Sequence, residues 1–401
     1  MEVMVSLVLM IVILILYPYL IYPSLVGLIY YLRKPKVCAS QNDQLQPFLS
    51  CIIAVYNEEA VIHEKIVTLL KSHFPKNKMK IYIGSDGSTD RSNEILHKIA
   101  QTDHRIVLKI FPERAGKASV INALTSLALT EHVSQSDHIL VYTDANIYLK
   151  PTTLEELVKG FSDARIAVID SRILQRSSNV YGVAGTEKNY IQLESRLKFM
   201  EGYLWGVSMG AFGGCYAVRA SYACQLPPGL LVDDFYITMQ AMIKGGLSIT
   251  QPMAICYEDI PDNILEEFKR KKRIAAGNFQ NMRMFLPKIF GMNFHLAFAF
   301  ISHKLMRWLV PFWGLILFML IAIGVIKQMA GFEWVACVMT IMILIFPGVD
   351  WLLGLINIKV QCLRSWRYFL LMNLAVLMGL LRYLQGIQKG TWQPPKRIQT
   401  H

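Results

Sequence analysis

The sequence has no closely spaced cysteine pair and neither of the two common glycine-rich phosphate-binding motifs. Its seven cysteines are an odd number, and they are scattered along the chain without a CxxC pair. This pattern predicts neither a disulfide framework nor a zinc knuckle, and it fits a reducing compartment. Because GxGxxG and GxxxxGK[ST] are both absent, a dinucleotide-binding fold and a P-loop kinase would lack their phosphate-binding loop.

Charged residues are also scarce, at 17% of the 401 residues, and their balance is basic, with a formal net charge of +12. A basic chain could bind nucleic acid. Much of the excess, however, lies beside apolar segments and in "FKRKKR" at 268–273. Basic residues next to a membrane are attracted to anionic lipid by about 1 kcal/mol each. We therefore predict an anionic lipid bilayer as a partner and no nucleic acid.

Apolar residues, 53% of the chain, gather at its two ends. The run at 3–31 is long enough for the ~20 apolar residues of a membrane-spanning helix, and "LRKPK" follows it directly. A secretory signal would have its basic flank first and a cleavage site after the apolar core, so we interpret residues 1–32 as a retained N-terminal transmembrane anchor. Because only Glu2 precedes the run, the positive-inside rule predicts an external N-terminus and a cytoplasmic central region.

The C-terminal part, residues 286–401, is expected to hold interfacial helices and a transmembrane region. The apolar stretches 308–326 and 334–356 predict two further spans of a multi-pass cell-membrane protein. The stretch 369–381 is shorter and has basic residues on both sides, which favours an interfacial helix. A tilted fourth span is the alternative, and the sequence leaves this choice open.

Between residues 48 and 175, apolar β-rich runs alternate with segments of helical periodicity. The runs are "FLSCIIAVYN", "KIYIGSD", "IVLKIF", "HILVYTDAN" and "AVIDSRIL". The segments between them, at 58–72, 90–101, 116–129 and 152–162, carry apolar residues at helical spacing. This alternation predicts an α/β fold with a parallel sheet covered by helices.

Polar residues follow four of these predicted strands, in "YNEE", "SDGSTD", "ERAGK" and "DAN". In parallel sheets, ligands bind beyond the carboxyl ends of the strands, so we expect these residues to meet at one edge. The edge would contain Asn57, Glu58, Asp86, Lys117 and Asp144. Carboxylates and a cation suit a nucleotide diphosphate with Mg²⁺, which takes few protein oxygens and is completed by phosphate and water. A turn role for Asp86 and a solvated helix start for Lys117 are the alternatives.

Six ordered motifs resemble those of the membrane-bound family 2 glycosyltransferases, which include the cellulose and hyaluronan synthases. They are "AVYNEEAVI", "SDGSTD", "AGKASVINAL", "YTDANIYLKPTTL", "VDDF" and "FKRKKRIAAGNFQ". The resemblance covers residues 45–285 and implies a cytosolic GT-A glycosyltransferase domain of Rossmann-like α/β fold. It also implies a UDP-sugar or similar nucleotide-sugar donor, inversion at the anomeric carbon, and a polysaccharide or lipid-linked acceptor.

The resemblance assigns the donor side of the site residue by residue. The positions matching those that hold the nucleotide base and ribose are Tyr56, Asn57, Glu58 and Asp86. Asp144 matches the first Asp of the DxD motif, which binds Mg²⁺ or Mn²⁺ on the diphosphate. Asn146 stands at the second Asp, so the metal site has one charge fewer, although an amide oxygen can still ligate.

The same resemblance assigns the catalytic acids. In "LVDDFYI", Asp234 matches the catalytic base and Asp233 its acidic neighbour. The acceptor hydroxyl must lose a proton as it attacks the anomeric carbon, which requires such a base. Adjacent like charges can raise the pKa of one carboxyl towards neutrality. The alternative is a pair of acids that complement the dipole at a helix N-terminus.

Two further segments match motifs of the family, and the first of them differs from the family pattern at some positions. In "RKKRIAAG", Arg273 matches the Arg of the QxxRW motif and is expected to contact the diphosphate. Arg270 stands at the Gln and Ile274 at the Trp, and the absence of that ring speaks against processive synthesis. The glycine-containing stretch at 206–227 resembles the acceptor-side segment, or forms a tight turn beside a core strand. A binding protein without turnover, serving a partner in polysaccharide assembly, is the alternative function.

Overall fold

The computed structural model describes residues 1–33, 47–132, 137–176, 183–258, 264–356 and 358–386. Within them, one sheet of eight strands has the order β3-β2-β1-β4-β7-β6-β8-β5. Its strands are β1 (Phe48–Val55), β2 (Met79–Asp86), β3 (Ile106–Phe111), β4 (His138–Thr143), β5 (Ile147–Leu149), β6 (Ile166–Gln175), β7 (Cys215–Arg219) and β8 (Leu247–Glu258). All eight residues of β1 are buried, as expected for a central strand covered on both faces.

The sheet is mixed, which corrects the expectation of a parallel sheet. Strands β3, β2, β1 and β4 are parallel neighbours, as the alternating pattern predicted. Strand β7 is antiparallel to both β4 and β6, and β5 is antiparallel to β8. The sequence did not identify β5, β7 or β8, because β5 has only three residues and because β7 and β8 follow residue 175, outside the alternation of runs and helices.

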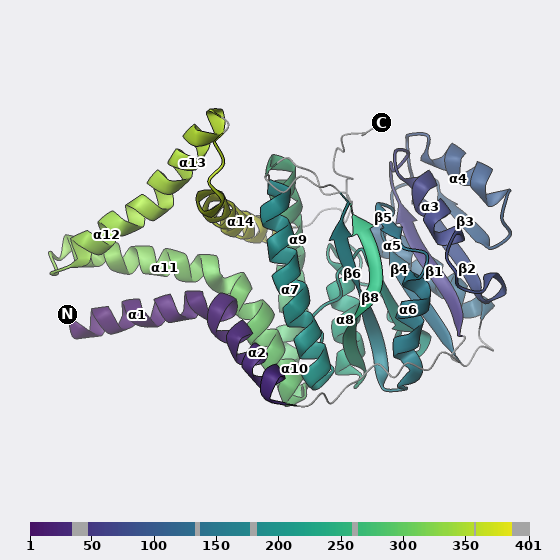
Figure 1. Ribbon diagram of the computed structural model, residues 1–401, viewed down its shortest axis with the longest axis horizontal. Coiled ribbons are helices and arrows are strands. Elements are labelled where there is room, and N and C mark those ends of the chain that lie inside the picture. The colour runs from purple at the N-terminus through teal and green to yellow at the C-terminus, as the bar shows by residue number, and fades with distance from the viewer. Residues whose placement is uncertain (34–46, 133–136, 177–182, 259–263, 357, 387–401) are drawn as a thin grey trace.

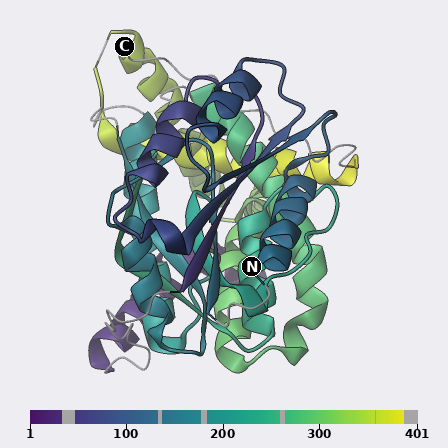
Figure 2. The same ribbon diagram turned by 90° about the vertical axis from the view of Figure 1, so that its right-hand side faces the viewer.

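Helices cover both faces of the sheet, as Figure 1 shows, and Figure 2 gives the same layers from the β3 side. They are α3 (Ile62–Leu70), α4 (Ser92–Ala100), α5 (Lys117–Glu131), α6 (Thr153–Lys159), α7 (Val183–Trp205), α8 (Asp233–Ile243) and α9 (Ile264–Phe285). One hydrophobic core contains residues of α3, α4 and α6, and a second contains residues of α5 and α8. The two cores hold the strand ends in fixed register.

The apolar ends of the chain form helices on one side of the sheet, and several of them extend away from it (Figure 1). They are α1 (Glu2–Leu16), α2 (Tyr22–Leu32), α10 (Phe294–Ala299), α11 (Met306–Ile326), α12 (Phe332–Thr340), α13 (Phe346–Leu355) and α14 (Gln361–Leu384), with π-helical turns after α1, α10 and α12. In the described part of the chain, four continuous helical segments are long and apolar enough to cross a membrane: 2–32, 294–326, 332–355 and 361–384.

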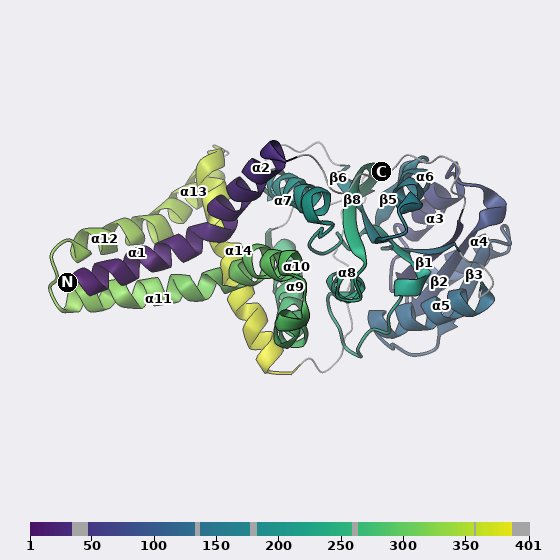
Figure 3. The ribbon, with the colours of Figure 1, turned by 90° about the horizontal axis from the view of Figure 1, so that it is seen from below.

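Helix α14 differs from the other three in direction. Figure 3 shows α1, α11 and α12 running away from the sheet, whereas α14 lies across them, beside α9. A Cβ atom at Gly379 would lie 2.4 Å from the Cβ of Ala275, so α14 and α9 approach closely at this point. Its composition permits a span, and its orientation favours the interfacial alternative.

Helix α7 connects the sheet to the apolar helices through buried polar contacts. On one side, Nζ of Lys198 lies 2.7 Å from Oδ2 of Asp170 on β6. On the other, Glu201 accepts hydrogen bonds from the hydroxyl of Tyr22 at 2.7 Å and from Nδ1 of His303 at 2.8 Å. A buried carboxylate is stable only when it is paired in this way, so these contacts fix the apolar helices relative to the sheet.

Candidate functional site

The carboxyl ends of β1, β2 and β4 bring the predicted polar residues to one edge of the sheet. Asp86, at the end of β2, is fully buried. Its carboxylate accepts hydrogen bonds from the backbone N–H of Ala115 at 2.6 Å and of Gly116 at 3.1 Å. Gly116 has φ +87°, a conformation that favours glycine. Asp86 therefore shapes the loop that precedes α5. This role goes beyond that of a residue in its own turn.

Sequence reasoning missed Arg114 in this loop. Its guanidinium carbon lies 3.5 Å from the centroid of the Tyr56 ring, and its Nε lies 4.0 Å from Oδ2 of Asp86. A cation stacked on an aromatic face and facing a carboxylate is held firmly in orientation. The signal was present in "ERAGK", where Arg114 stands next to the glycine loop.

Asn57 and Glu58 join the end of β1 to the loop after β2. Asn57 has φ +49°, and its Oδ1 accepts a hydrogen bond from the backbone N–H of Thr89 at 2.8 Å. The backbone N–H of Glu58 donates to Oγ of Ser92 at 2.9 Å. These contacts place both residues beside Asp86, at the edge where the sequence predicted nucleotide binding.

Lys117 lies at the centre of the site. Its Nζ is 2.9 Å from Oδ1 of Asp144, which follows β4, and 3.1 Å from Oδ1 of Asp233, which begins α8. Burial alone lowers the pKa of Lys117, but the charges of Asp144 and Asp233 outweigh it and raise that pKa above its ordinary value. The structure thus brings together residues from three separate motifs around one ammonium group.

Asp234 lies beside this group at the N-terminus of α8. Its Oδ1 accepts a hydrogen bond from the backbone N–H of Phe235 at 2.7 Å. Burial, followed by the charge of Asp233, raises the pKa of Asp234 to about 6. A carboxylate with this pKa is ionised at neutral pH and more basic than an ordinary Asp, as a general base requires.

The turn that carries Asp144 is fixed by a buried lysine. Nζ of Lys65 donates hydrogen bonds of 2.6 Å to Oγ1 of Thr143 and to the carbonyl oxygen of Ile147. Between these two anchors, the backbone N–H of Asp144 donates to the carbonyl of Gly214 at 3.0 Å. Asn146 donates through Nδ2 to Oε1 of Glu258 at 3.3 Å.

The groups on this turn fit a divalent cation completed by a diphosphate. The donors are oxygens, the Asp144 side chain is 39% exposed, and the ammonium of Lys117 already contacts its carboxylate. Among the residues that the structure describes, no group of three or more His, Cys, Asp or Glu could hold a metal ion by itself. Phosphate oxygens and water would have to supply the remaining ligands, which is the usual arrangement for Mg²⁺.

The basic helix α9 contributes Arg273 to this edge. Its Nη1 donates to the carbonyl oxygen of Leu231 at 3.2 Å, just before Asp233. Burial lowers the pKa of Arg273, while the charges of Asp144 and Asp233 act in the opposite direction. Arg270, in contrast, pairs with Glu267 of the same helix at 2.8 Å. Arg273 therefore lies close enough to Asp144 and Asp233 for their charges to act on it, and part of the charge of Arg270 is neutralised within α9.

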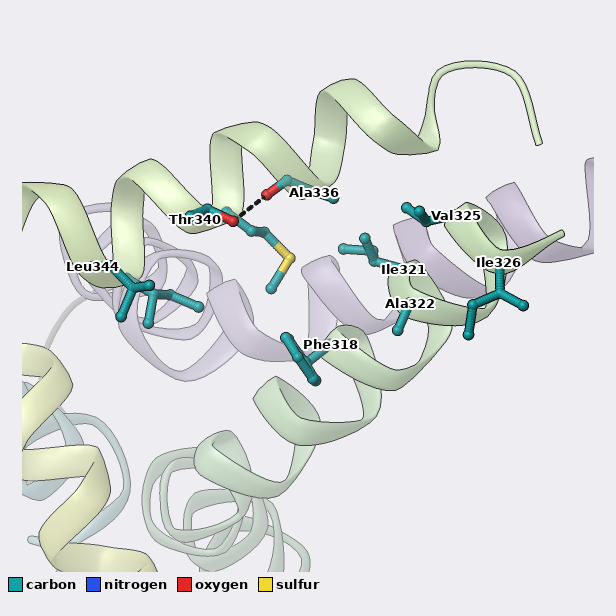
Figure 4. Close-up of a pocket in the computed structure, with 10 residues that line it drawn as sticks. Phe318, Ile321, Ala322, Val325, Ile326, Ala336, Thr340 and Leu344 are labelled. Carbon is teal, nitrogen blue, oxygen red and sulfur yellow. Dashed lines mark hydrogen bonds between the residues drawn. The ribbon is translucent and has the colours of Figure 1, made fainter. Parts of the chain in front are cut away.

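A separate apolar groove lies between α11 and α12, at a distance from the strand ends (Figures 1 and 4). Its lining includes Phe318, Ile321, Val325, Met339 and Ile343. Its single polar side chain, Thr340, donates to the carbonyl oxygen of Ala336 at 2.9 Å. No ionisable group lines this groove, so it offers neither an acid nor a base.

Several proteins of known name are similar in sequence to this chain. The chain is 21% identical over 273 residues to an N-acetylglucosaminyltransferase of Rhizobium leguminosarum bv. viciae, covering 63% of this chain and 60% of the relative. It is 22% identical over 253 residues to the poly-beta-1,6-N-acetyl-D-glucosamine synthase of Staphylococcus aureus, covering 62% and 58%. The chain thus spans less than two thirds of the length of these relatives.

A solved structure extends the likeness to almost the whole chain. The mannosyltransferase PcManGT from Pyrobaculum calidifontis, in complex with GDP-Man and Mn²⁺, superposes with a TM-score of 0.70 at 16% identity. The match covers 95% of this chain and 99% of the other. This likeness confirms the predicted GT-A fold.

Two family profiles match the chain. "Glycosyl transferase family 2" matches residues 50–222, which contain Asp86, Lys117 and Asp144. "Glycosyl transferase family group 2" matches residues 139–349, more than half of the chain, including Asp233, Asp234 and Arg273. The chain therefore belongs to glycosyltransferase family 2.

Proposed function

We propose that the protein is an inverting, membrane-bound transferase that moves a sugar from a nucleotide-sugar donor, of the UDP-sugar type, to a polysaccharide or lipid-linked acceptor. The observation that carries this proposal is the contact of Lys117 with both Asp144 and Asp233. It joins the carboxylate expected at the donor diphosphate to the acid next to Asp234, the residue expected at the acceptor hydroxyl. The two reactants would therefore meet within one site.

On the acceptor side, Asp234 removes the proton from the attacking hydroxyl. The acceptor oxygen forms its bond to the anomeric carbon from the face opposite the diphosphate, and the bond from that carbon to the diphosphate oxygen breaks, which inverts the configuration. Burial and then the charge of Asp233 keep the pKa of Asp234 raised. Ionisation of Asp234 near neutral pH then matches the task of a general base.

On the donor side, cations of the chain meet the leaving diphosphate. Lys117 and Arg273 neutralise its developing charge, since Arg presents a planar pair of donors and Lys a compact charge. A bound Mg²⁺ or Mn²⁺, held by Asp144 and Asn146, would supply further stabilisation of the diphosphate as a Lewis acid. Tyr56, Asn57, Glu58 and Asp86 hold the nucleoside, with Arg114 fixed on the ring of Tyr56.

The apolar helices support a place for this reaction at the cytoplasmic face of the cell membrane. With the N-terminus outside, α1 and α2 lead the chain inward, and the sheet follows on the cytoplasmic side. The names of the relatives favour N-acetylglucosamine as the sugar, with a hexose as the alternative.

A turnover assay with a panel of donors tests the proposal. The full-length protein in lipid membranes is given UDP-N-acetylglucosamine, UDP-glucose or GDP-mannose, and release of nucleoside diphosphate is measured with Mg²⁺, Mn²⁺ or EDTA. We expect release from a UDP-sugar with metal, and none from Asp144→Ala. Donor binding without any release from the panel would favour the binding-protein alternative, and undiminished release in EDTA would contradict the metal-dependent mechanism.

A further inference from the structure

A carboxylate from β8 stands next to the turn that carries the metal-binding motif. The register pairs Ile147 of β5 with Glu258 of β8, which brings Glu258 beside Asn146 although 112 positions separate them in the sequence. Oε1 of Glu258 accepts a hydrogen bond of 3.3 Å from Nδ2 of Asn146. Neither the motif nor the roles given above assign a function to this carboxylate.

Both partners of this contact sit on a fixed backbone. The two hydrogen bonds of Lys65 anchor the turn on either side of Asn146. The carbonyl oxygen of Glu258 accepts a hydrogen bond of 3.1 Å from the backbone N–H of Arg176, next to β6. Strand β8 therefore lies between β5 and β6 as far as its last residue, and the Glu258 carboxylate is presented from the sheet itself.

The contact with Glu258 determines which way the carboxamide of Asn146 faces. A carboxamide has a single ligating atom, its oxygen, whereas the nitrogen is only a hydrogen-bond donor. A carboxylate that binds the nitrogen directs the oxygen to the opposite side. Outer carboxylates orient metal ligands in this way, and their loss costs typically 10–100-fold in metal affinity.

We propose that Glu258 is a positioning residue of the metal site. It holds the nitrogen of Asn146 so that the carboxamide oxygen is offered to the cation, and its charge replaces the one that Asn146 lacks relative to a DxD motif. The site then has two carboxylates, Asp144 from β4 and Glu258 from β8, instead of two from one turn. This inference rests on the proposed function, because the cation belongs to the donor diphosphate.

The first test measures Mn²⁺ binding without turnover. Full-length protein with UDP is titrated with Mn²⁺, and free Mn²⁺ is read by electron paramagnetic resonance. Glu258→Gln keeps the shape of the side chain but removes its charge, and we expect Mn²⁺ affinity to fall about 10–100-fold. Glu131→Gln is the matched control, since Glu131 is also paired, with Lys80 at 2.8 Å, but lies at the C-terminal end of α5; its affinity should equal the wild type.

The second test separates positioning from a general structural role. In an Asn146→Asp background there is no amide to orient, and Glu258 faces a like charge. Glu258→Gln should there leave Mn²⁺ affinity unchanged or increase it. An equal loss in both backgrounds would overturn the proposal, because it would show that Glu258 acts independently of Asn146.

The outcomes also distinguish this inference from the function on which it rests. Wild-type protein that binds no Mn²⁺ with UDP would contradict the metal-dependent function and the inference together. Wild-type binding with unchanged affinity in Glu258→Gln would overturn the inference alone. If Glu258→Gln does not fold, Glu258→Asp gives the same decision: its shorter side chain withdraws from Asn146, so a loss of affinity supports the proposal and an unchanged affinity rejects it.

Discussion

Nζ of Lys117 lies 2.9 Å from Oδ1 of Asp144, and this ion pair joins the start of α5 to the end of β4. The same ammonium contacts Asp233 at 3.1 Å. One lysine therefore compensates two carboxylates that come from motifs almost ninety positions apart, about one quarter of the chain. Its removal would leave these acids to repel each other and the third acid beside them, Asp234.

The first prediction concerns the pH dependence of turnover. A general base acts only when deprotonated, so kcat/KM should fall as the pH decreases through the pKa of Asp234, which is about 6. Burial and Asp233 raise this pKa, whereas Lys117 lowers it. In Lys117→Met the pKa should therefore rise, and the acidic limb of the profile should move to higher pH. Lys117→Arg keeps the charge, so the acidic limb of its pH profile should stay near the wild-type position. An acidic limb that moves to lower pH in Lys117→Met would contradict this assignment.

The second prediction separates the two adjacent acids. Asp234→Asn keeps the shape of the side chain and removes its basicity, so turnover should fall by about 10²–10⁴-fold, the usual contribution of general-base catalysis. Donor affinity, measured by UDP-sugar binding, should change little. Asp233→Asn should reduce turnover less, because it acts through the pKa of its neighbour. The reverse order of effects would shift the assigned base by one residue.

The sequence could predict the site residues that stand at strand ends, but not those that are brought together by the pairing of strands. The strand ends at Asp86 and Asp144 follow from the alternation of apolar runs and helices, and the fold predicted from them is confirmed by the solved relative. Contacts that depend on the order of the strands in the sheet could not be predicted from the sequence. Glu258 meets Asn146 only because β8 pairs with β5, and β5 has just three residues, too few for a recognisable period.

Arg114 shows a second limit. It lay inside a quoted motif, but its role depends on the loop that Asp86 shapes through the N–H groups of Ala115 and Gly116. That geometry brings the guanidinium over Tyr56, which comes from the end of another strand. Side-chain contacts between loops depend on backbone direction, and the sequence pattern carries no information on it.

The third prediction concerns helix α14, which lies across the other apolar helices (Figure 3). If α14 is interfacial, both of its ends lie on the cytoplasmic side. In a protein whose other cysteines are replaced, Cys362 at its start and a cysteine introduced by Gln385→Cys just after its end should react with an impermeant maleimide from the same face of sealed vesicles. Reaction from opposite faces would establish a fourth span. Cys337 of α12, which is exposed in the structure, is a reference for a residue within an apolar segment.

The last prediction uses the close approach of a glycine to the proposed base. Gly213 lies in the loop before β7, and a Cβ atom built on it would lie 2.5 Å from Oδ2 of Asp234 and 3.1 Å from its Cγ. Such a separation is far inside van der Waals contact, and Oδ1 of Asp234 is already held by the N–H of Phe235. The carboxylate cannot stay in place when a methyl group occupies this position.

Gly213→Ala should therefore displace the Asp234 carboxylate and reduce kcat, because misplacing a reacting group by about 1 Å can cost on the order of 10²-fold in rate. UDP-sugar affinity should be nearly unchanged, because the substitution displaces the acceptor-side carboxylate and none of the residues assigned to the donor. Gly291→Ala is the control: nothing lies within 4 Å of a Cβ there, so this variant should keep wild-type turnover. Thermal unfolding of both variants separates a local displacement from a loss of fold. Full activity in a folded Gly213→Ala protein would mean that Asp234 does not need its observed position, and its role as the base would then have to be given up.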